Sequence, residues 1–358
     1  MNGPAPLAAR IAELIAVQGP ISVAQYMTLA LHDAQSGYYA TRDPLGADFI
    51  TAPEISQMFG EMLGLWCVQV WEDQGRPQNL RLVELGPGRG TLMADMLRAM
   101  KQAPDMKVDV VMVEASPVLQ AIQRRTLRDS GASIVWKTHF DEELADRPLL
   151  LVANEFFDAL PIRQYAKTQR GWCERMVVEK DSALSFALAP SALPPSAIPP
   201  ERAAAPDGGI YETSPASTAL AEEIARIVAV KGGGALILDY GYSGPGGFGE
   251  TLQAVKANAF ADVLADPGSH DLSAHVDFAA MAEAGRRGGA IVHGPRGQGE
   301  FLVRLGLARR AEQLMKANPA KAKSIYAALE RLIHPAQMGT LFKALAFLPP
   351  PAGPAPGF

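Results

Sequence analysis

Residues 81–98 read RLVELGPGRGTLMADMLR, and this stretch decides the fold prediction. An apolar segment leads into a turn with glycine at every second position, Gly86, Gly88 and Gly90, and an amphipathic segment follows. Glycine tolerates positive φ and has no Cβ, so a ligand can lie against bare backbone in such a turn. The amides and the positive dipole end of the next helix point at the same place. Strand, glycine turn and helix in this order are typical of doubly wound α/β proteins that hold a nucleotide-like cofactor.

The spacing of the glycines and the acids around them narrow the choice of cofactor. A dinucleotide fingerprint requires a glycine at position 91, where this chain has Thr91, and no Gly-Lys-Ser/Thr of a phosphate loop follows. Glu84 precedes the turn; it would repel a pyrophosphate but attract the cationic amino-acid end of S-adenosylmethionine (SAM). Glu114 ends the next predicted strand about 25 residues past the turn, near the spacing at which such folds bind ribose hydroxyls. The predicted SAM site comprises Glu84, Gly86, Pro87, Gly88, Gly90 and Glu114.

Composition and charge limit the remaining classes of function. The chain has 358 residues and a net charge of −5, so no overall basic field would recruit nucleic acid or anionic lipid. No apolar run approaches the roughly 20 residues that cross a bilayer. The first residues lack the pattern of a signal or transit peptide. Two cysteines and no His/Cys cluster with zinc spacing predict no metal site and a reducing compartment, the cytoplasm.

The order of the predicted elements gives the domain organisation. Alternating strands and helices from residue 80 to residue 153 predict a mainly parallel, doubly wound sheet. We expect an N-terminal helical cap region over 1–75 and a Rossmann-like domain over 76–348. Insertions at about 164–212 and 243–275 are expected over the carboxyl edge of the sheet, and the proline-rich residues 349–358 are expected to be disordered. Residues 187–209 read as a surface arm, and 300–318 as one helix.

A polar segment between residues 32 and 56 has no regular periodicity and contains Tyr38, Tyr39, Asp48 and Glu54. Connections of this length without structure of their own are usually functional or disordered, and the aromatic residues argue against disorder. We therefore expect this segment to contribute to the active site.

The exit of the fourth predicted strand of the sheet reads NEFFDALP over 154–161. Asn154 should meet the cofactor, since ligands of open α/β sheets lie beyond the carboxyl ends of the strands. Glu155 and Asp158 could grip a cationic acceptor by charge-assisted hydrogen bonds. The same residues could instead cap a helix that starts at Phe156.

The pair His270–Asp271 and the residue Asp141 each allow two interpretations. His270 and Asp271 could form a base and its orienting partner, or Ser273 or Asp271 could cap a helix at Val276 while His270 lies at the surface. Asp141 follows the third predicted strand of the sheet and could contact the adenine amine of the cofactor, or be an ordinary loop acid.

Many ordered motifs of the chain resemble the MidA-type family of SAM-dependent methyltransferases, which includes the mitochondrial complex I assembly factor. The likeness runs from about residue 22 to 347 and comprises SVAQYMTLALHDAQSGYYA, DFITAPEISQMFGE, VELGPGRGTLMADMLR, NEFFDALPI, DYGY, HDLSAHVDF, QGEFLVRLG and MGTLFKALAF. The resemblance implies a class I SAM-dependent methyltransferase fold, with Glu84, the glycines and Glu114 on the cofactor and residues 154–161 between cofactor and acceptor.

The resemblance also implies an acceptor, which is an arginine of a core subunit of respiratory complex I, dimethylated symmetrically in eukaryotic relatives. Without a recognisable mitochondrial presequence the chain looks like a bacterial member, whose acceptor would be the equivalent subunit of NADH dehydrogenase. Two alternatives stay open: a small-molecule methyltransferase of the same fold, and an assembly chaperone that binds SAM without turnover. The oligomeric state, including a homodimer, is not fixed by the sequence.

Overall fold

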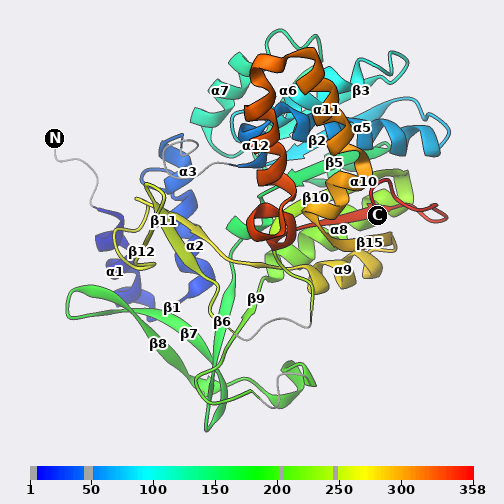
Figure 1. Ribbon diagram of the computed structural model, residues 1–358. Helices are drawn as coiled ribbons and strands as arrows, with labels where there is room; N and C mark the ends of the chain where they lie inside the picture. The colour runs from blue at the N-terminus through cyan, green and yellow to red at the C-terminus, as the bar shows by residue number, and fades with distance from the viewer. Residues whose placement is uncertain (1–5, 44–50, 201–204, 245–248) are drawn as a thin grey trace. The chain divides into compact units, whose positions relative to one another are not determined.

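The computed structural model describes residues 6–43, 51–200, 205–244 and 249–358 (Figure 1). Two compact units are formed, each from three segments of the chain. The sheet unit comprises Ile50–Phe157, Ala219–Gly241 and Ala280–Phe358. The small unit comprises Met1–Phe49, Asp158–Thr218 and Tyr242–Ala279.

The sheet unit is built on a mixed sheet whose central strands are parallel. Its strands are β2 (Leu80–Leu85), β3 (Val108–Val113), β4 (Ile134–Lys137), β5 (Leu149–Asn154), β10 (Gly233–Tyr242), β15 (Ile291–Gly297) and β16 (Phe342–Leu348). They are ordered β15-β16-β10-β5-β2-β3-β4. The run from β10 to β4 is parallel, and β16 is antiparallel to both of its neighbours. The order reverses between β2 and β5, which is the switch point where open α/β sheets bind ligands. The predicted α/β fold with a mainly parallel sheet is confirmed.

Helices cover this sheet and supply most of its core. They are α4 (Ala52–Ile55), α5 (Gln57–Asp73), α6 (Thr91–Met100), α7 (Pro117–Thr126), the C-terminal part of α8 (Pro215–Lys231), most of α9 (Phe278–Arg287), α10 (Gln298–Leu305), α11 (Leu307–Ala317) and α12 (Ala322–Ile333). Trp66 of α5 and Met96 of α6 are buried in one apolar cluster with side chains of β2 and β5. Gly64 lets these helices approach closely, because a Cβ there would lie 2.7 Å from the carbonyl oxygen of Met96.

The small unit joins the N-terminal helices to antiparallel sheets. Its helices are α1 (Leu7–Gln18), α2 (Val23–His32) and α3 (Tyr38–Thr41). One sheet has the order β1 (Ile21–Ser22), β7 (Gly171–Lys180), β6 (Arg163–Thr168) and β9 (Ile210–Thr213), with β8 (Ala183–Ala192) on β7. The other contains β12 (Ala259–Ala261), β11 (Gln253–Lys256) and β13 (Asp271–Ser273). Ser22 and Gln25 form a capping box that starts α2, and Ile11, Tyr26 and Val177 share one buried cluster.

Three expectations about local structure were wrong. The expected surface arm begins as a strand, since β8 pairs with β7 as far as Ala192. The expected helix over 300–318 breaks at Gly306, whose φ of 100° ends α10. The expected disorder of residues 349–358 is replaced by packing: Ala355 is 2% exposed, and the ring of Phe358 lies 5.1 Å from that of Phe301.

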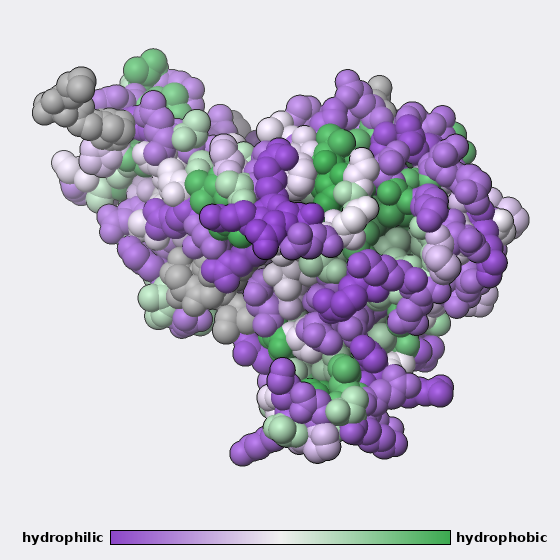
Figure 2. Space-filling model, turned by 90° about the horizontal axis from the view of Figure 1, so that it is seen from above, coloured by the Kyte–Doolittle hydropathy of each residue, from purple (hydrophilic) through white to green (hydrophobic). Residues whose placement is uncertain are grey.

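The surface is mixed in character, as the mean hydropathy of +0.03 suggests. Hydrophilic side chains dominate the face in Figure 2, with smaller hydrophobic areas between them. Among the described residues, no helix is both long and apolar enough to cross a membrane.

Candidate functional site

The glycine turn connects β2 to α6 and needs its glycines for their backbone conformation. The φ angles are 61° at Gly86, 51° at Gly88 and 81° at Gly90, all in the left-handed region that residues with a Cβ avoid. The amide of Gly90 donates to the carbonyl of Pro87 at 2.7 Å and closes the turn. At Gly86 space is short as well, because a Cβ would lie 2.8 Å from Cδ2 of Phe156. The three glycine positions of the turn therefore present bare backbone.

Glu84 lies immediately before this turn and is 2% exposed. Burial, and then the nearby Glu114, raise its pKa to about 8, although a backbone hydrogen bond from Met93 lowers it. Its Oε2 has no hydrogen-bond partner among the described residues. Buried oxygens are nearly always paired, so this one is suited to a donor supplied by a ligand.

Glu114 follows β3 and lies on the same face of the sheet as Glu84. In the parallel register Glu84 is opposite Met112, and side chains two residues apart on a strand share a face. The Oε1 of Glu114 accepts from the amide of Ser116 at 2.8 Å, and its Oε2 accepts from Nε2 of Gln123 at 3.1 Å. Burial raises the pKa of Glu114 to about 7. This buried carboxyl is held in place by donors on both oxygens.

Asn154 ends β5 on the same face again, because Val152 is the residue opposite Glu84. Its Nδ2 donates to Oε1 of Glu155 at 3.2 Å, which leaves Oδ1 pointing elsewhere. This buried Oδ1 has no hydrogen-bond partner in the described part of the chain. Two unsatisfied oxygens, on Asn154 and Glu84, thus belong to neighbouring strands at the switch point.

Glu155 adopts an unusual backbone conformation, with a φ of 51°. Its amide donates to the carbonyl of Leu238 at 2.9 Å, and its Oε1 also accepts from the amide of Ala52 at 3.0 Å. A non-glycine residue in the left-handed region is strained and is often found at functional sites.

The turn after Glu155 is short. Only a 3₁₀ turn, η2 (Phe157–Ala159), is present where the alternative interpretation placed a helix. Asp239, in the second half of β10, is fully buried and accepts from the amides of Phe156 and Phe157 at 3.1 and 2.9 Å. Asp239 therefore caps this turn from a strand that lies far from it in the sequence.

Glu54 is placed at the glycine turn by α4. Its Oε1 accepts from the hydroxyl of Thr91, the first residue of α6, at 2.7 Å. Asp48, the other acid of this segment, lies outside the described residues. The helix α4 therefore contacts both the start of α6 and, through Ala52, the loop after β5.

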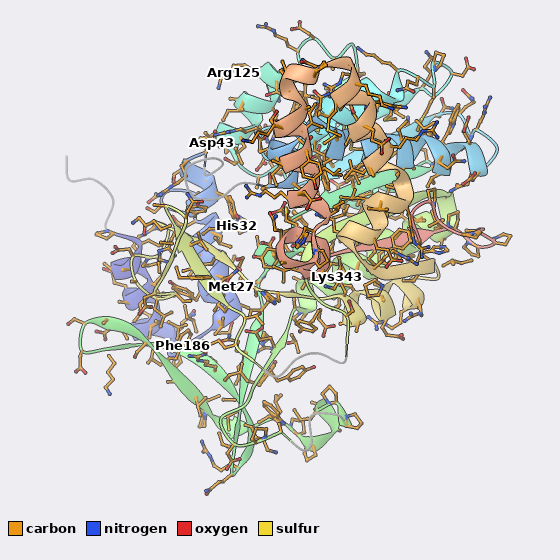
Figure 3. All side chains as sticks on the ribbon, viewed as in Figure 1. Met27, His32, Asp43, Arg125, Phe186 and Lys343 are labelled. Carbon is orange, nitrogen blue, oxygen red and sulfur yellow. The ribbon has the colours of Figure 1, made fainter. Side chains whose placement is uncertain are left out.

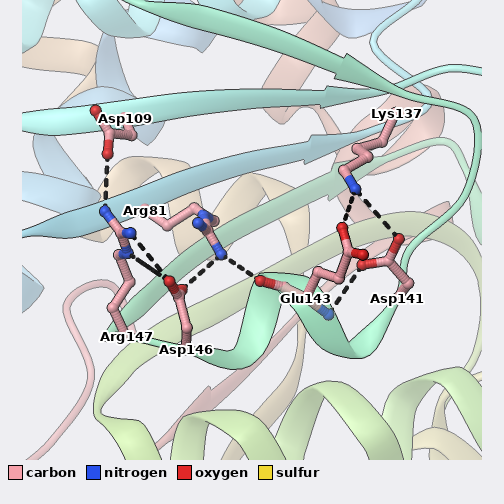
Figure 4. A network of polar contacts seen from close by, with 7 residues as sticks. All are labelled: Arg81, Asp109, Lys137, Asp141, Glu143, Asp146 and Arg147. Carbon is pink, nitrogen blue, oxygen red and sulfur yellow. Dashed lines mark hydrogen bonds and ion pairs between the residues drawn. The ribbon is translucent and has the colours of Figure 1, made fainter.

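Asp141 lies in the polar network of Figure 4, close to the end of β4. Its Oδ1 accepts from the amide of Glu143 at 3.0 Å and caps the 3₁₀ turn η1 (Glu142–Ala145). Its Oδ2 lies 3.6 Å from Nζ of Lys137. These contacts fit the interpretation as a structural loop acid, and contact with adenine stays a prediction.

The remaining predicted residues belong to the small unit. Asp158 is 9% exposed, and its carbonyl accepts from the amide of Ala274 at 2.9 Å. Asp271 accepts from the hydroxyl of Tyr39 at 2.7 Å. Burial, then Asp271 and then Asp158, raise the pKa of Tyr39, and its ring stacks on His32, labelled in Figure 3. The carboxyls of Asp158 and Asp271 therefore both act on one phenol.

His270 does not pair with Asp271 as a base with its orienting partner. Its Nδ1 lies 3.3 Å from the hydroxyl of Ser269, and its buried Nε2 has no hydrogen-bond partner among the described residues. Burial lowers the pKa of this imidazole. The neutral form, which can accept a proton, is thereby favoured.

The sequence interpretation overlooked Gln123 and Phe156. Gln123 is 0% exposed and contacts both the glycine turn and Glu114. The available signal was an amide that interrupts the apolar stripe of an amphipathic helix, four residues after the buried Leu119. Phe156 packs against Gly86 because two loops meet in the folded chain, and no local sequence pattern indicates this contact.

This arrangement fits SAM. The glycine turn has no side chain at positions 86, 88 and 90, two buried oxygens without partners among the described residues suit a cationic amino group, and Glu114 suits the hydroxyls of a ribose. In the described part of the chain no group of three or more potential ligands could hold a metal ion.

Comparison with known proteins supports the same conclusion. Residues 62–296 match a family described as S-adenosyl-L-methionine-dependent methyltransferases. A relative from Drosophila melanogaster named protein arginine methyltransferase NDUFAF7 homolog, mitochondrial, is 37% identical, with 97% of this chain and 86% of the relative covered. The human protein arginine methyltransferase NDUFAF7, mitochondrial, is 35% identical over 97% of this chain and 84% of its own length.

A solved structure is also similar over its whole length. The crystal structure of a Burkholderia thailandensis protein bound to S-adenosyl-homocysteine is 31% identical, has a TM-score of 0.85, and covers 100% of this chain and 97% of its own. The fold is therefore that of class I SAM-dependent methyltransferases. On these similarities and on the geometry of the glycine turn, the chain belongs to the SAM-dependent methyltransferase family that includes the NDUFAF7 proteins.

Proposed function

We propose that this protein is a SAM-dependent protein arginine N-methyltransferase that modifies a core subunit of respiratory complex I or bacterial NADH dehydrogenase during assembly. The observation that carries the proposal is Glu155: a carboxylate held in a strained conformation directly after the strand end that bears Asn154. Relatives named as protein arginine methyltransferases, at 35–37% identity over nearly the whole chain, support the choice of acceptor.

The cofactor would be held by the residues that surround the switch point. Glu84 and the Oδ1 of Asn154 would bind its amino group, and Glu114 would bind its ribose. The cofactor would lie against the backbone of the turn formed by Gly86, Pro87, Gly88 and Gly90. Asp141 is retained as the residue for the adenine amine. When bound, SAM supplies a methyl group that is already activated for transfer, so the protein has to orient the acceptor rather than activate the donor.

The acceptor sets a harder problem, because a guanidinium stays protonated at physiological pH. The protein must therefore take a cation out of water, pair it with carboxylates and leave one nitrogen facing the methyl group. We assign the carboxylate grip to Glu155 and Asp158. His270 is the proposed proton acceptor, since burial lowers its pKa and its Nε2 has no partner among the described residues.

Labelled SAM, incubated with the protein and purified complex I subunits, tests the proposal by mass spectrometry. Methylated arginine on a core subunit is the expected product. Methylation of small molecules alone would favour the small-molecule enzyme, and SAM binding without any methyl transfer would favour the assembly chaperone. Either result overturns the proposed acceptor and leaves the cofactor assignment intact.

A further inference from the structure

Gln123 of α7 connects three parts of the sheet unit that lie apart in the sequence. Its side chain is 0% exposed. Its Nε2 donates to the carbonyl of Gly88 at 2.7 Å and to Oε2 of Glu114 at 3.1 Å. Its Oε1 accepts from the indole N–H of Trp136 at 2.9 Å. One amide thus touches the glycine turn, the carboxyl after β3 and a side chain of β4.

The chemistry of the partners allows only one orientation of this amide. An indole nitrogen is only a donor, so it must face Oε1 of Gln123. A backbone carbonyl is only an acceptor, so Gly88 must face Nε2. Rotating the amide by half a turn would oppose donor to donor at Trp136 and acceptor to acceptor at Gly88. Arg124 lies over the ring of Trp136 at 3.9 Å and keeps the indole in place.

The orientation has a consequence for Glu114. With Nε2 toward Oε2 of Glu114 and the amide of Ser116 on Oε1, both oxygens receive hydrogen bonds and neither is favoured as the site of a proton. The hydrogen bond from Gln123 lowers the pKa of Glu114 against the larger effect of burial, which raises it. Glu84 is a titratable neighbour of Glu114, and the charge of Glu114 raises the pKa of Glu84.

We infer that Gln123 is a positioning residue that fixes the carboxyl of Glu114 and favours its ionised form, which only accepts hydrogen bonds, so that the site selects a ligand with free ribose hydroxyls. The inference rests on the proposed role of Glu114 at the ribose. Gln123 itself need not touch the ligand. Because its Nε2 also donates to the carbonyl of Gly88, the side chain of Gln123 fixes the distance between the glycine turn and the carboxyl of Glu114.

The test variant is Gln123→Met, which keeps the length of the side chain and removes its donor and acceptor. Gln120→Met is the matched control: Gln120 lies one turn away on α7 and donates to the backbone carbonyl of Glu114 at 2.8 Å, not to the carboxyl. Calorimetry would measure binding of S-adenosyl-homocysteine and of its 2′-deoxy and 3′-deoxy analogues.

Wild type should prefer the full ribose, and Gln123→Met should lose about tenfold or more in affinity for it, the scale of a hydrogen bond to a charged group. The variant should bind the deoxy analogues almost as well as wild type does, so that the preference for hydroxyls disappears. Gln120→Met should keep the preference. An equal loss for all three ligands would mean that Gln123 only supports the fold, and it would overturn the inference.

A measurement without ligand is also available. The carboxyl ¹³C signal of Glu114, assigned with Glu114→Gln, should titrate at higher pH in Gln123→Met than in wild type. If Gln123→Met does not fold, Trp136→Phe keeps an aromatic ring under Arg124 and removes the donor that orients the amide. It should raise the same titration midpoint and weaken the hydroxyl preference. An unchanged midpoint in the folded variant overturns the inference, whereas wild type that binds no S-adenosyl-homocysteine would overturn the cofactor assignment instead.

Discussion

The backbone N–H of Ala52 donates to the Oε1 of Glu155 at 3.0 Å, and this bond joins α4 to the loop after β5. The same oxygen accepts from Nδ2 of Asn154, so the side chain of Glu155 is fixed beside a residue at the proposed cofactor site. A carboxylate positioned in this way can act on an acceptor without first being ordered by it.

Glu155→Gln should separate binding from turnover. Glutamine keeps the oxygen that Ala52 and Asn154 need but removes the charge. We expect SAM affinity within about threefold of wild type and methylation of an arginine peptide reduced by at least about 10²-fold, as for a group that acts mainly in the transition state. Titration calorimetry and a radiolabelled methyl-transfer assay measure the two quantities. Near-normal methylation would move the grip on the acceptor elsewhere, for example to Glu54.

The raised pKa of Glu84, about 8, predicts proton release on cofactor binding. Near neutral pH the free protein holds Glu84 mostly protonated, and a cationic amino group favours the ionised form. Affinity for SAM should therefore rise with pH until Glu84 is ionised in the free protein. Calorimetry near pH 7 in buffers of different ionisation enthalpy should show close to one proton released by wild type. Glu84→Gln should release markedly less; equal release by both proteins would contradict the assignment.

The same raised pKa should make the ligand-free protein lose stability with rising pH. The folded state holds a proton that the unfolded chain gives up near its ordinary value of 4.5, so the contribution is complete below that value. It is lost as pH rises toward about 8. Urea unfolding at about pH 5.5 and pH 8 should show a smaller decrease for Glu84→Gln than for wild type, by an amount on the order of 1 kcal/mol or more. Parallel behaviour of the two proteins would argue against a strongly buried proton.

Gly86→Ala should damage the turn by two effects that a control can separate. The substitution forces a Cβ into the left-handed region at φ 61° and places it 2.8 Å from Phe156. Gly131→Ala has the same kind of backbone, at φ 78°, but nothing within 4 Å of the new Cβ. Each should lose about 1 kcal/mol for the backbone, and Gly86→Ala should lose more and also bind SAM weakly. Equal losses, with SAM affinity intact, would show that Phe156 moves aside freely.

Tyr39→Phe and Tyr26→Phe form a matched pair in the small unit. The hydroxyl of Tyr39 donates to the carboxylate of Asp271 at 2.7 Å, whereas that of Tyr26 donates to the carbonyl of Val263 at 2.6 Å. Hydrogen bonds to charged groups contribute about 1.5–3 kcal/mol and neutral ones about 1 kcal/mol. Tyr39→Phe should therefore lower the free energy of unfolding more than Tyr26→Phe does. The reverse order would indicate that Asp271 has adequate donors without Tyr39.

Much of the sheet unit could be predicted from the sequence, because its strands are short apolar runs bounded by turn residues. The alternation of strands and helices predicted from residue 80 to residue 153 is present, and it begins with β2 and ends with β5. The strand β8 was not predicted, since most of it is exposed or half-buried and its second half is rich in alanine and contains Pro190, which is unfavourable inside a strand. Gly306 sits inside a continuous helical pattern, and only the observed φ shows that it ends a helix.

The site could be predicted only where the register of neighbouring strands places polar residues on one face of the sheet. Glu84, Glu114 and Asn154 share one face because parallel pairing places Met112 and Val152 beside Glu84. Gln123 and the capping role of Asp239 escaped prediction because their partners lie on other elements, far away in the sequence. Such contacts leave no periodic trace in the chain, whereas polar residues at strand ends do.

The way in which the chain alternates between its units has a consequence for folding. The segments of the small unit end at Phe49, Thr218 and Ala279, and the sheet unit is completed only by β16 near the end of the chain. On the ribosome, neither unit can be completed until most of the chain has been synthesised. Contacts between distant segments slow folding, since loop closure must precede the gain from pairing. Nascent chains should therefore expose apolar strands for long periods and depend on chaperones more than a protein with contiguous domains would.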